Sequence, residues 1–471
     1  MRTHLRTTAA TVAVALAAPT LSACTVAGAG ADGDDVVTVG YQSKTINTVT
    51  AGTLLRERGF FERELEKLDG GPYDVEWLDY DTGAPITAQM LAGKIDIGSM
   101  GDYPMLINGS RAGTSEDTGT RMVSITGYNS LGALNGVVVD EDSPIEDLED
   151  LDGTSVSASV GSAGHGTLVQ ALDRAGIDPE DDVSIENQQP SVGSSALDSG
   201  SVDALSQFVA WPGLLAFRDD ARLVYDGGRL GVPTLHGVVT RNEFADTDPD
   251  VVKAFLRAQI DATNFLHEHP VEAAEIVAEE TGLPAEVVYL YNGRNGIATF
   301  DATVKPELTD ALEQDLPFLE SIGVLDDPVD LDEFIDDGAL RDVYGSGYTA
   351  DTDALVNPAA IAGRDEVCDR KVGDATVAGE VWVDGEQDTR PAADPTCLLR
   401  TIAEVREQGG DIRAAYIPDA TTGTRWFADR MIWLRDGDEL LPFATRETAD
   451  AYLDEHRRAE ELDYEAAIEA A

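Results

Sequence analysis

Two glycine-containing stretches of this chain have the residue types that hold a small anion. Residues 161–166 read GSAGHG and precede an expected helix over residues 167–175. Glycines let the backbone approach a ligand closely, and a helix N-terminus offers N–H donors at the positive end of its dipole. The spacing lacks the Lys-Ser/Thr pair of a nucleotide-binding loop, so it favours a small oxyanion. His165 could donate to that ligand or could simply be solvated.

The second stretch, residues 82–104, reads TGAPITAQMLAGKIDIGSMGDYP. It predicts a loop at residues 82–84, a helix from Pro85 to Gly93, a strand containing Ile95 and Ile97, and a second loop at residues 100–104. Both loops would open at the carboxyl edge of a sheet, where open α/β sheets bind ligands. An ordinary connection in any α/β protein remains the alternative on spacing alone.

The elements around these loops predict more than one domain. A chain of 471 residues is too long for a single core. Strands are expected at residues 36–42 and 73–80, and helices dominate residues 248–344. The segments LNGVVVDED (134–142) and LHGVVTRNE (235–243) are near-copies. Two similar strands around an inserted unit are what two hinge crossings between lobes would produce, although chance similarity would also explain them.

The N-terminus has the features of an export signal. Arg2 and Arg6 precede an apolar run that is too short to span a membrane, which needs about 20 residues, and LSAC follows at residues 21–24. This pattern matches a bacterial lipobox, so residues 1–23 are expected to be removed and Cys24 to be lipidated. Residues 24–35 would then form a flexible tether.

The net charge excludes two classes of partner. With 33 basic and 88 acidic residues the formal charge is −55. Such a surface repels nucleic acid and anionic lipid, so neither is expected as a partner, and membrane contact would come from the lipid anchor alone. The charge itself is more simply a solubility device in a salty habitat.

The stretch at residues 82–104 resembles the signature of the nitrate/sulfonate/taurine branch of ABC-transporter substrate-binding proteins. The matching positions are Gly83, Gly93, Asp96, Gly98, Gly101 and Pro104. The resemblance covers roughly residues 36–345. It implies an α/β, bilobal periplasmic-binding-protein type II fold with a two-strand hinge, in which residues 36–137 and 238–345 form lobe I and residues 138–237 form lobe II.

This resemblance implies an extracytoplasmic, monomeric solute-binding component of an ABC importer, with a permease and an ATPase as partners. The solute would be a sulfonate, taurine, nitrate or similar small anion or zwitterion, and a thiamine precursor is the alternative. The candidate ligand contacts are Gln42, Ser43, Lys44, Thr82, Gly83 and Asp102 in lobe I, and Ser162, His165, Gln189 and Trp211 in lobe II. Asp102 would suit an ammonium group on the ligand, or would cap the following helix.

An enzyme is the rival class. Some relatives of this fold are desulfinases with a nucleophilic cysteine, and others make the thiamine pyrimidine. The chain has no cysteine between Cys24 and Cys368, so the binding region lacks the desulfinase nucleophile and the cysteine run of the second group. We therefore expect no catalytic residue and no cofactor.

A linker is expected at residues 346–365, and residues 366–460 resemble the NosL family of copper-binding lipoproteins. The resemblance rests on ADPTCLLRTIAEV, IRAAYIPDATTGTRWFADRMIWL and LPFATRETADAYLDEH. It implies a small α+β domain, but the second cysteine and both methionines of the family motifs are missing. Cu(I) selects soft sulfur ligands, and only Cys368, Cys397 and Met431 remain as a copper site or metallochaperone alternative. A disulfide between Cys368 and Cys397 is favoured, because thiols pair in oxidising compartments.

Overall fold

The computed structural model describes residues 35–113, 118–325, 327–353 and 355–471. The expected signal peptide, Cys24 and all but the last residue of the expected tether lie outside the described residues. In the described part of the chain, no helix combines the length and the apolar character that crossing a membrane requires.

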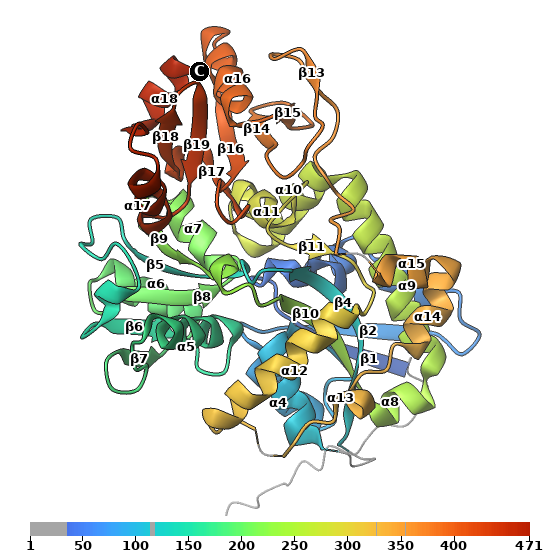
Figure 1. Ribbon diagram of the computed structural model, residues 1–471. Coiled ribbons are helices and arrows are strands. Elements are labelled where there is room, and N and C mark those ends of the chain that lie inside the picture. The colour runs from blue at the N-terminus through green and yellow to red at the C-terminus, as the bar shows by residue number, and fades with distance from the viewer. Residues whose placement is uncertain (1–34, 114–117, 326, 354) are drawn as a thin grey trace, which may run out of the picture. The chain divides into compact units, whose positions relative to one another are not determined.

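The first lobe is built on a six-stranded sheet in the order β11-β4-β10-β3-β1-β2 (Figure 1). Its strands are β1 (Asp35–Tyr41), β2 (Tyr73–Asp79), β3 (Ile97–Gly101), β4 (Thr120–Asn129), β10 (Thr234–Arg241) and β11 (Thr299–Phe300). Strand β1 pairs in parallel with β2 and β3, while β10 is antiparallel to β3 and β4. The carboxyl ends of β1 and β3 therefore open at one edge.

The second lobe has a five-stranded sheet in the order β7-β6-β8-β5-β9. Its strands are β5 (Asn135–Asp140), β6 (Ser155–Ala158), β7 (Ser184–Asn187), β8 (Ala204–Phe208) and β9 (Ala221–Asp226). Strand β6 is parallel to β7 and β8, and β5 is antiparallel to β8 and β9. The carboxyl ends of β6, β7 and β8 therefore open at one edge of this sheet.

The chain passes between the two sheets twice, through residues 130–134 and 227–233. The predicted lobe boundaries at 137/138 and 237/238 fall inside β5 and β10. In the structure the boundaries are residues 130–134 and 227–233. The two near-copy strands are not themselves the crossings, because β5 pairs only within the second sheet and β10 only within the first. Both strands are buried, and valine is common in buried strands, so their sequences are similar.

The helices of the two lobes follow from local signals. They are α1 (Thr53–Glu57), α2 (Phe60–Leu65), α3 (Gly83–Leu91), α4 (Asp102–Ala112), α5 (Ala163–Ala175), α6 (Pro190–Asp198), α7 (Trp211–Phe217), α8 (Asn242–Thr247), α9 (Pro249–Glu268), α10 (Pro270–Thr281), α11 (Ala285–Asn292), α12 (Pro306–Ser321), α13 (Leu331–Phe334), α14 (Gly338–Tyr344) and α15 (Tyr348–Thr352). Helix α9 shows the logic: Pro249 starts it, where a missing N–H is harmless, and Pro270 prevents its continuation. Its Phe255 packs edge-on against Phe61 in the first-lobe core.

Two predicted loops are helix starts instead. Residues 100–104 were expected to be a loop, but β3 runs to Gly101 and α4 begins at Asp102. Pro104 is the third residue of α4, a position where its missing N–H has no intrahelical partner to lose. Residues 163–166 likewise belong to α5, which starts four residues earlier than predicted because Ser162 caps it. Gly164 and Gly166 are unusual inside a helix, and for this reason the sequence predicted a loop there.

The C-terminal part contains three small sheets, in the orders β12-β13, β15-β14-β16-β17 and β19-β18-β20. Their strands are β12 (Arg364–Asp365), β13 (Arg370–Lys371), β14 (Gly379–Val383), β15 (Arg390–Ala392), β16 (Ile412–Pro418), β17 (Arg425–Phe427), β18 (Ile432–Asp436), β19 (Glu439–Phe443) and β20 (Glu460–Leu462), with helices α16 (Pro395–Glu407), α17 (Arg446–Glu455) and α18 (Tyr464–Ala470). Helix α18 extends beyond the predicted end at 460, and α15 and β12 occupy parts of the predicted linker.

The C-terminal part shares a hydrophobic core with the binding lobes. Tyr289 of α11 packs against Trp382 and Tyr416, with ring centroids 5.3 and 5.4 Å apart. Beside them the buried Arg425 pairs with Glu380 at 2.7 Å, and the Tyr289 hydroxyl donates to the same carboxylate at 3.0 Å. This core continues into helix α7 of the second lobe. The C-terminal part is therefore anchored against the binding lobes by buried contacts.

Candidate functional site

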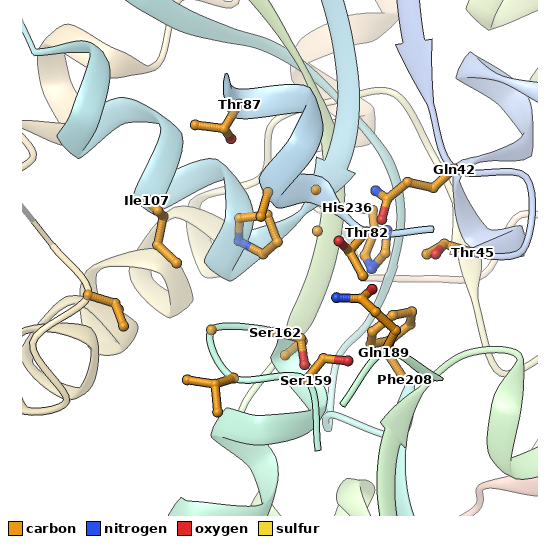
Figure 2. A pocket seen from close by; sticks show the side chains of 18 of the residues that line it. Gln42, Thr45, Thr82, Thr87, Ile107, Ser159, Ser162, Gln189, Phe208 and His236 are labelled. Atoms are coloured by element: carbon orange, nitrogen blue, oxygen red, sulfur yellow. The ribbon is translucent and has the colours of Figure 1, made fainter. Parts of the chain in front are cut away.

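A cavity of about 140 Å³ lies between the ligand-facing edges of the two lobes. Figure 2 shows side chains from both lobes around it, with Thr82 and His236 from the first lobe and Ser159, Ser162 and Phe208 from the second. Both sheets therefore contribute to a single site. This is the geometry in which a ligand can bridge two lobes and favour their closure.

Four helix N-termini meet at this cavity. The residues that precede α3, α4, α5 and α6 all line it: Thr82, Gly101, Ser162 and Gln189. The first N–H groups of a helix have no intrahelical partner and carry partial positive charge. Four such ends present N–H donors and partial positive charge to one cavity, which is chemistry that suits a negatively charged group.

The ionisable side chains that line the cavity, among the described residues, are Arg111 and His236. None of the described residues that line it is Asp or Glu, and Arg111 is the cationic side chain among them. Burial lowers the pKa of His236 to about 3, so its imidazole is neutral at physiological pH. A neutral imidazole keeps one N–H donor and one acceptor. Nδ1 of His236 and the hydroxyl of Thr45 have no partner among the described residues.

The apolar part of the lining consists of Ala84, Pro104, Ile107, Val160, Ala163, Phe208 and Val324 together with glycine backbone, and Gln42, Thr87, Ser159 and Asn187 add further polar side chains. A lining that combines helix N-termini with apolar side chains is compatible with a small organic oxyanion that carries a short hydrocarbon part.

Five predicted contacts line the cavity: Gln42, Thr82, Gly83, Ser162 and Gln189. Gln42 follows β1 and donates through Nε2 to the Ser99 carbonyl at 3.2 Å, which fixes its side chain. Gly83 must be small, because a Cβ there would lie 2.5 Å from the Pro104 ring. The close packing of α3 on α4 thus positions two of the four helix N-termini.

Ser43, Lys44 and Trp211 are not among the described lining residues. The backbone N–H and the hydroxyl of Ser43 both donate to Asp79, at 2.8 and 2.6 Å. Lys44 reaches toward Asp81 at the surface, 3.9 Å away. Trp211 begins α7 and packs against the core shared with the C-terminal part. Each of them therefore has another contact in the structure.

Asp102 and His165 lie close to the cavity without lining it. The Asp102 carboxylate accepts the backbone N–H groups of Tyr103 and Leu235 at 2.8 and 3.0 Å and is fully buried. It is therefore turned to the first-lobe backbone instead of toward a ligand ammonium. His165 lies in the first turn of α5, where its N–H donates to the Ser162 hydroxyl, and burial lowers its pKa.

Sequence reasoning missed several lining residues, including Thr45, Ser159, Phe208 and His236. His236 lies on β10 opposite Gly101 of β3, and a Cβ on Gly101 would lie 3.1 Å from its Nε2. Phe208 ends β8, and Ser159 follows β6 directly. The signal that could have found Ser159 and Phe208 is their place at strand ends, but His236 depends on an antiparallel pairing across distant segments.

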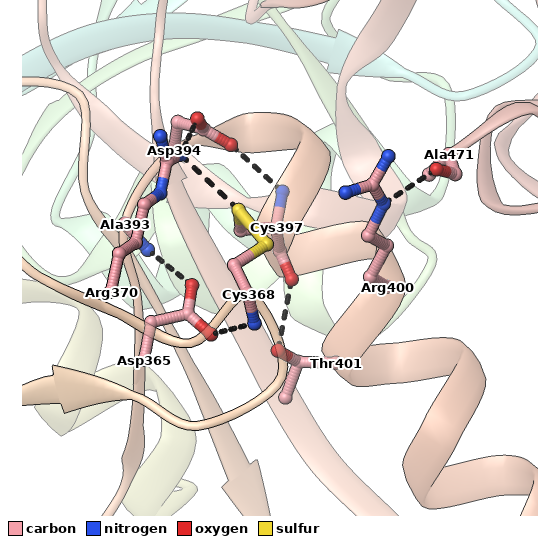
Figure 3. The surroundings of a disulfide bond; sticks show 9 residues. All are labelled: Asp365, Cys368, Arg370, Ala393, Asp394, Cys397, Arg400, Thr401 and Ala471. Atoms are coloured by element: carbon pink, nitrogen blue, oxygen red, sulfur yellow. Dashed lines mark hydrogen bonds and ion pairs between the residues drawn. A yellow bond between two sulfur atoms is a disulfide. The ribbon is translucent and has the colours of Figure 1, made fainter.

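Cys368 and Cys397 form a disulfide beside the N-terminus of α16 (Figure 3). Asp365 accepts the backbone N–H groups of Cys368 and Ala393, both at 2.9 Å, and Arg370 donates to the Cys397 sulfur at 3.2 Å. Asp365 and the two sulfurs are close enough to surround an ion. The bonded sulfurs are not thiolates, however, and Met431 lines a different cavity. These residues as arranged do not fit a soft Cu(I) site.

Solved structures define the class of the fold. The alkanesulfonate-binding protein SsuA from Xanthomonas axonopodis pv. citri, bound to MOPS, superposes with a TM-score of 0.55 at 20% identity, over 65% of this chain and 99% of that chain. The periplasmic nitrate-binding protein NrtA from Synechocystis PCC 6803 gives 0.53 at 15% identity, over 70% and 94%. The chain thus has the mixed α/β, periplasmic-binding-protein-like fold expected from its sequence.

Sequence comparisons find one matching family model and several relatives that are named as binding proteins. Residues 56–273 match the model of a family described as NMT1/THI5 like. A Bacillus subtilis (strain 168) protein named for binding aliphatic sulfonates is 26% identical over 323 residues, which are 68% of this chain and 92% of that protein. The taurine-binding periplasmic protein of Escherichia coli (strain K12) is 32% identical over 194 residues, 40% of this chain and 56% of that protein.

Proposed function

We propose that this protein is the extracytoplasmic solute-binding component of an ABC importer and that it binds a small organic sulfonate between its lobes. The observation that carries the proposal is the meeting of four helix N-termini at a cavity whose described lining contains no carboxylate. The relatives named for sulfonates and taurine support the same class of solute. A permease and an ATPase would be its partners.

Within this class, the geometry favours a sulfonate without an ammonium group. Taurine carries an ammonium beside its sulfonate, and a buried ammonium needs an acceptor or a negative partner. The Asp102 carboxylate, which lies close to the cavity, already accepts two backbone N–H groups. Nitrate would leave the apolar lining unused. A plain alkanesulfonate uses both the helix N-termini and the apolar wall.

Thermal-shift measurements on the purified protein test this preference for an alkanesulfonate over taurine and nitrate. Propanesulfonate and taurine have the same number of heavy atoms and differ by a methyl against an ammonium group. We expect propanesulfonate to stabilise the protein by about 2.7 kcal/mol at a hundredfold excess over its Kd, and taurine and nitrate to stabilise it less. A larger shift with taurine would overturn the choice of alkanesulfonate, and no shift with any of the three would overturn the oxyanion site.

The proposed location depends on Cys24, which lies outside the described residues. Lipidation of this residue would hold the protein at the outer face of the cell membrane. A Cys24→Ala variant expressed in its own cell type should therefore appear in the medium, with a Ser22→Ala variant as the control that stays in the membrane fraction. Membrane retention of the Cys24→Ala variant would contradict the anchor.

The C-terminal part serves, in this proposal, as an accessory domain without a resident metal. Its disulfide and its shared core with α7 and α11 give it a structural role beside the binding lobes. The NosL-like resemblance would then describe a retained fold whose copper ligands have been lost.

A further inference from the structure

Tyr103, on helix α4 of the first lobe, reaches the second lobe beside the cavity. Its hydroxyl accepts a hydrogen bond from Nε2 of Gln170 on α5 at 2.8 Å. The side chain is almost fully buried, yet it is not among the described residues that line the cavity. This hydrogen bond therefore joins the two lobes next to the ligand site without occupying it.

The Tyr103 ring fits against the second lobe only because residue 166 is glycine. A Cβ built on Gly166 would lie 1.9 Å from a ring carbon of Tyr103, far inside van der Waals contact. In the first lobe the same ring packs at a tilt against Phe318, with centroids 5.7 Å apart. The ring thus fills the space between α5 of the second lobe and α12 of the first.

A third group, Asp315 on α12, completes the cluster. Its carboxyl lies beside the Tyr103 hydroxyl and is buried. Burial raises the pKa of Asp315 well above its ordinary range, and the nearby Asp102 carboxylate raises it further. The Tyr103 hydroxyl, which accepts from Gln170, can donate its own hydrogen to this carboxyl. The hydroxyl then has one partner on each lobe.

We infer that Tyr103 is a positioning residue that stabilises the closed arrangement of the lobes and so raises the affinity for a ligand it does not touch. The inference rests on the proposed function, in which the ligand bridges the two lobes. Apparent affinity scales with the fraction of protein in the binding-competent conformation. Losing an interlobe hydrogen bond lowers that fraction and weakens binding even though the cavity lining is unchanged.

The test is a Tyr103→Phe variant, which keeps the ring against Gly166 and Phe318 but lacks the hydroxyl. Calorimetry should show about three- to tenfold weaker binding of propanesulfonate, the range expected for one neutral hydrogen bond. Tyr128→Phe is the matched control: Tyr128 is a buried first-lobe tyrosine whose hydroxyl has no partner among the described residues. Its affinity should equal that of the unaltered protein. Equal affinities for the two variants would overturn the inference.

A double-mutant cycle separates the interlobe bond from a local effect. If Tyr103 acts through Gln170, then Tyr103→Phe combined with Gln170→Leu should cost no more affinity than the larger single loss. Simple additivity of the two losses would show that the residues act independently and would overturn the interlobe role.

A readout without ligand keeps this inference distinct from the proposed function. In small-angle X-ray scattering of the ligand-free proteins, Tyr103→Phe should have a larger radius of gyration than the unaltered protein and Tyr128→Phe should not. If the unaltered protein does not bind propanesulfonate, but ligand-free Tyr103→Phe still has a larger radius of gyration than the unaltered protein, the proposed ligand is wrong and the positioning role is supported. An unchanged radius overturns the positioning role.

Discussion

Replacing Arg425 with methionine is expected to destabilise the protein by about 3 kcal/mol. The Arg425 and Glu380 side chains are 4% and 1% exposed, and their charged groups lie 2.7 Å apart. Removing one partner of a buried ion pair leaves an uncompensated charge, which typically costs about 3 to 5 kcal/mol. We expect the low end because Arg294 remains 3.7 Å from Glu380 and two hydroxyls still donate to it.

Urea unfolding followed by tryptophan fluorescence measures this loss, since Trp382, Trp426 and Trp433 lie in the C-terminal part. Arg457→Met is the control, because the Arg457–Asp454 pair is 79% and 78% exposed and such pairs contribute little. Adding Glu380→Met to Arg425→Met should recover much of the stability, as paired apolar replacements often do. Equal stability of Arg425→Met and Arg457→Met would contradict the shared buried core.

The second large effect is expected from Ala163→Asp, which should weaken propanesulfonate binding by about a hundredfold or more. Ala163 is the first residue of α5 and lines the cavity, so the new carboxylate would face the bound anion. Placing like charges together costs several kcal/mol, and each 1.4 kcal/mol is about tenfold in affinity. The fold should persist because aspartate in a first turn favours the helix dipole.

Ala163→Asn is the matched control, because asparagine has nearly the same size and shape without the charge. Calorimetric titration of both variants isolates the electrostatic part, and Ala163→Asn should lose less than about tenfold. Similar losses in the two variants would mean that crowding, and not charge, limits binding, which would contradict an anion site.

Local signals in the sequence were sufficient for much of the first lobe. Strands β1 and β2 lie within a residue of their predicted bounds, because alternating apolar residues and flanking turn residues mark them clearly. Helix α3 was predicted from Pro85 and Gly93, but it spans Gly83–Leu91 and so begins inside the predicted loop at residues 82–84. The helix starts at Asp102 and Ala163 were missed, since glycine and proline near a helix start resemble a loop.

The residues that line the cavity were also partly predictable from local sequence signals. Thr82, Ser162 and Gln189 were predicted as ligand contacts and line the cavity, because residues at strand-to-helix junctions meet at one sheet edge in this class of fold. His236 and the Tyr103–Gln170 contact were not found, because they depend on pairings between segments far apart in the chain. Lys44 and Trp211 were predicted as ligand contacts, but they are not among the described lining residues and have other contacts.

The central claim is that the interlobe cavity selects a negatively charged organic solute. Isothermal titration of the unaltered, full-length mature protein with propanesulfonate and with propylammonium tests it most directly, because the two solutes share a hydrocarbon part and differ in charge. We expect saturable one-to-one binding of propanesulfonate and no detectable heat from propylammonium. Binding of propylammonium, or its absence for propanesulfonate, would contradict it.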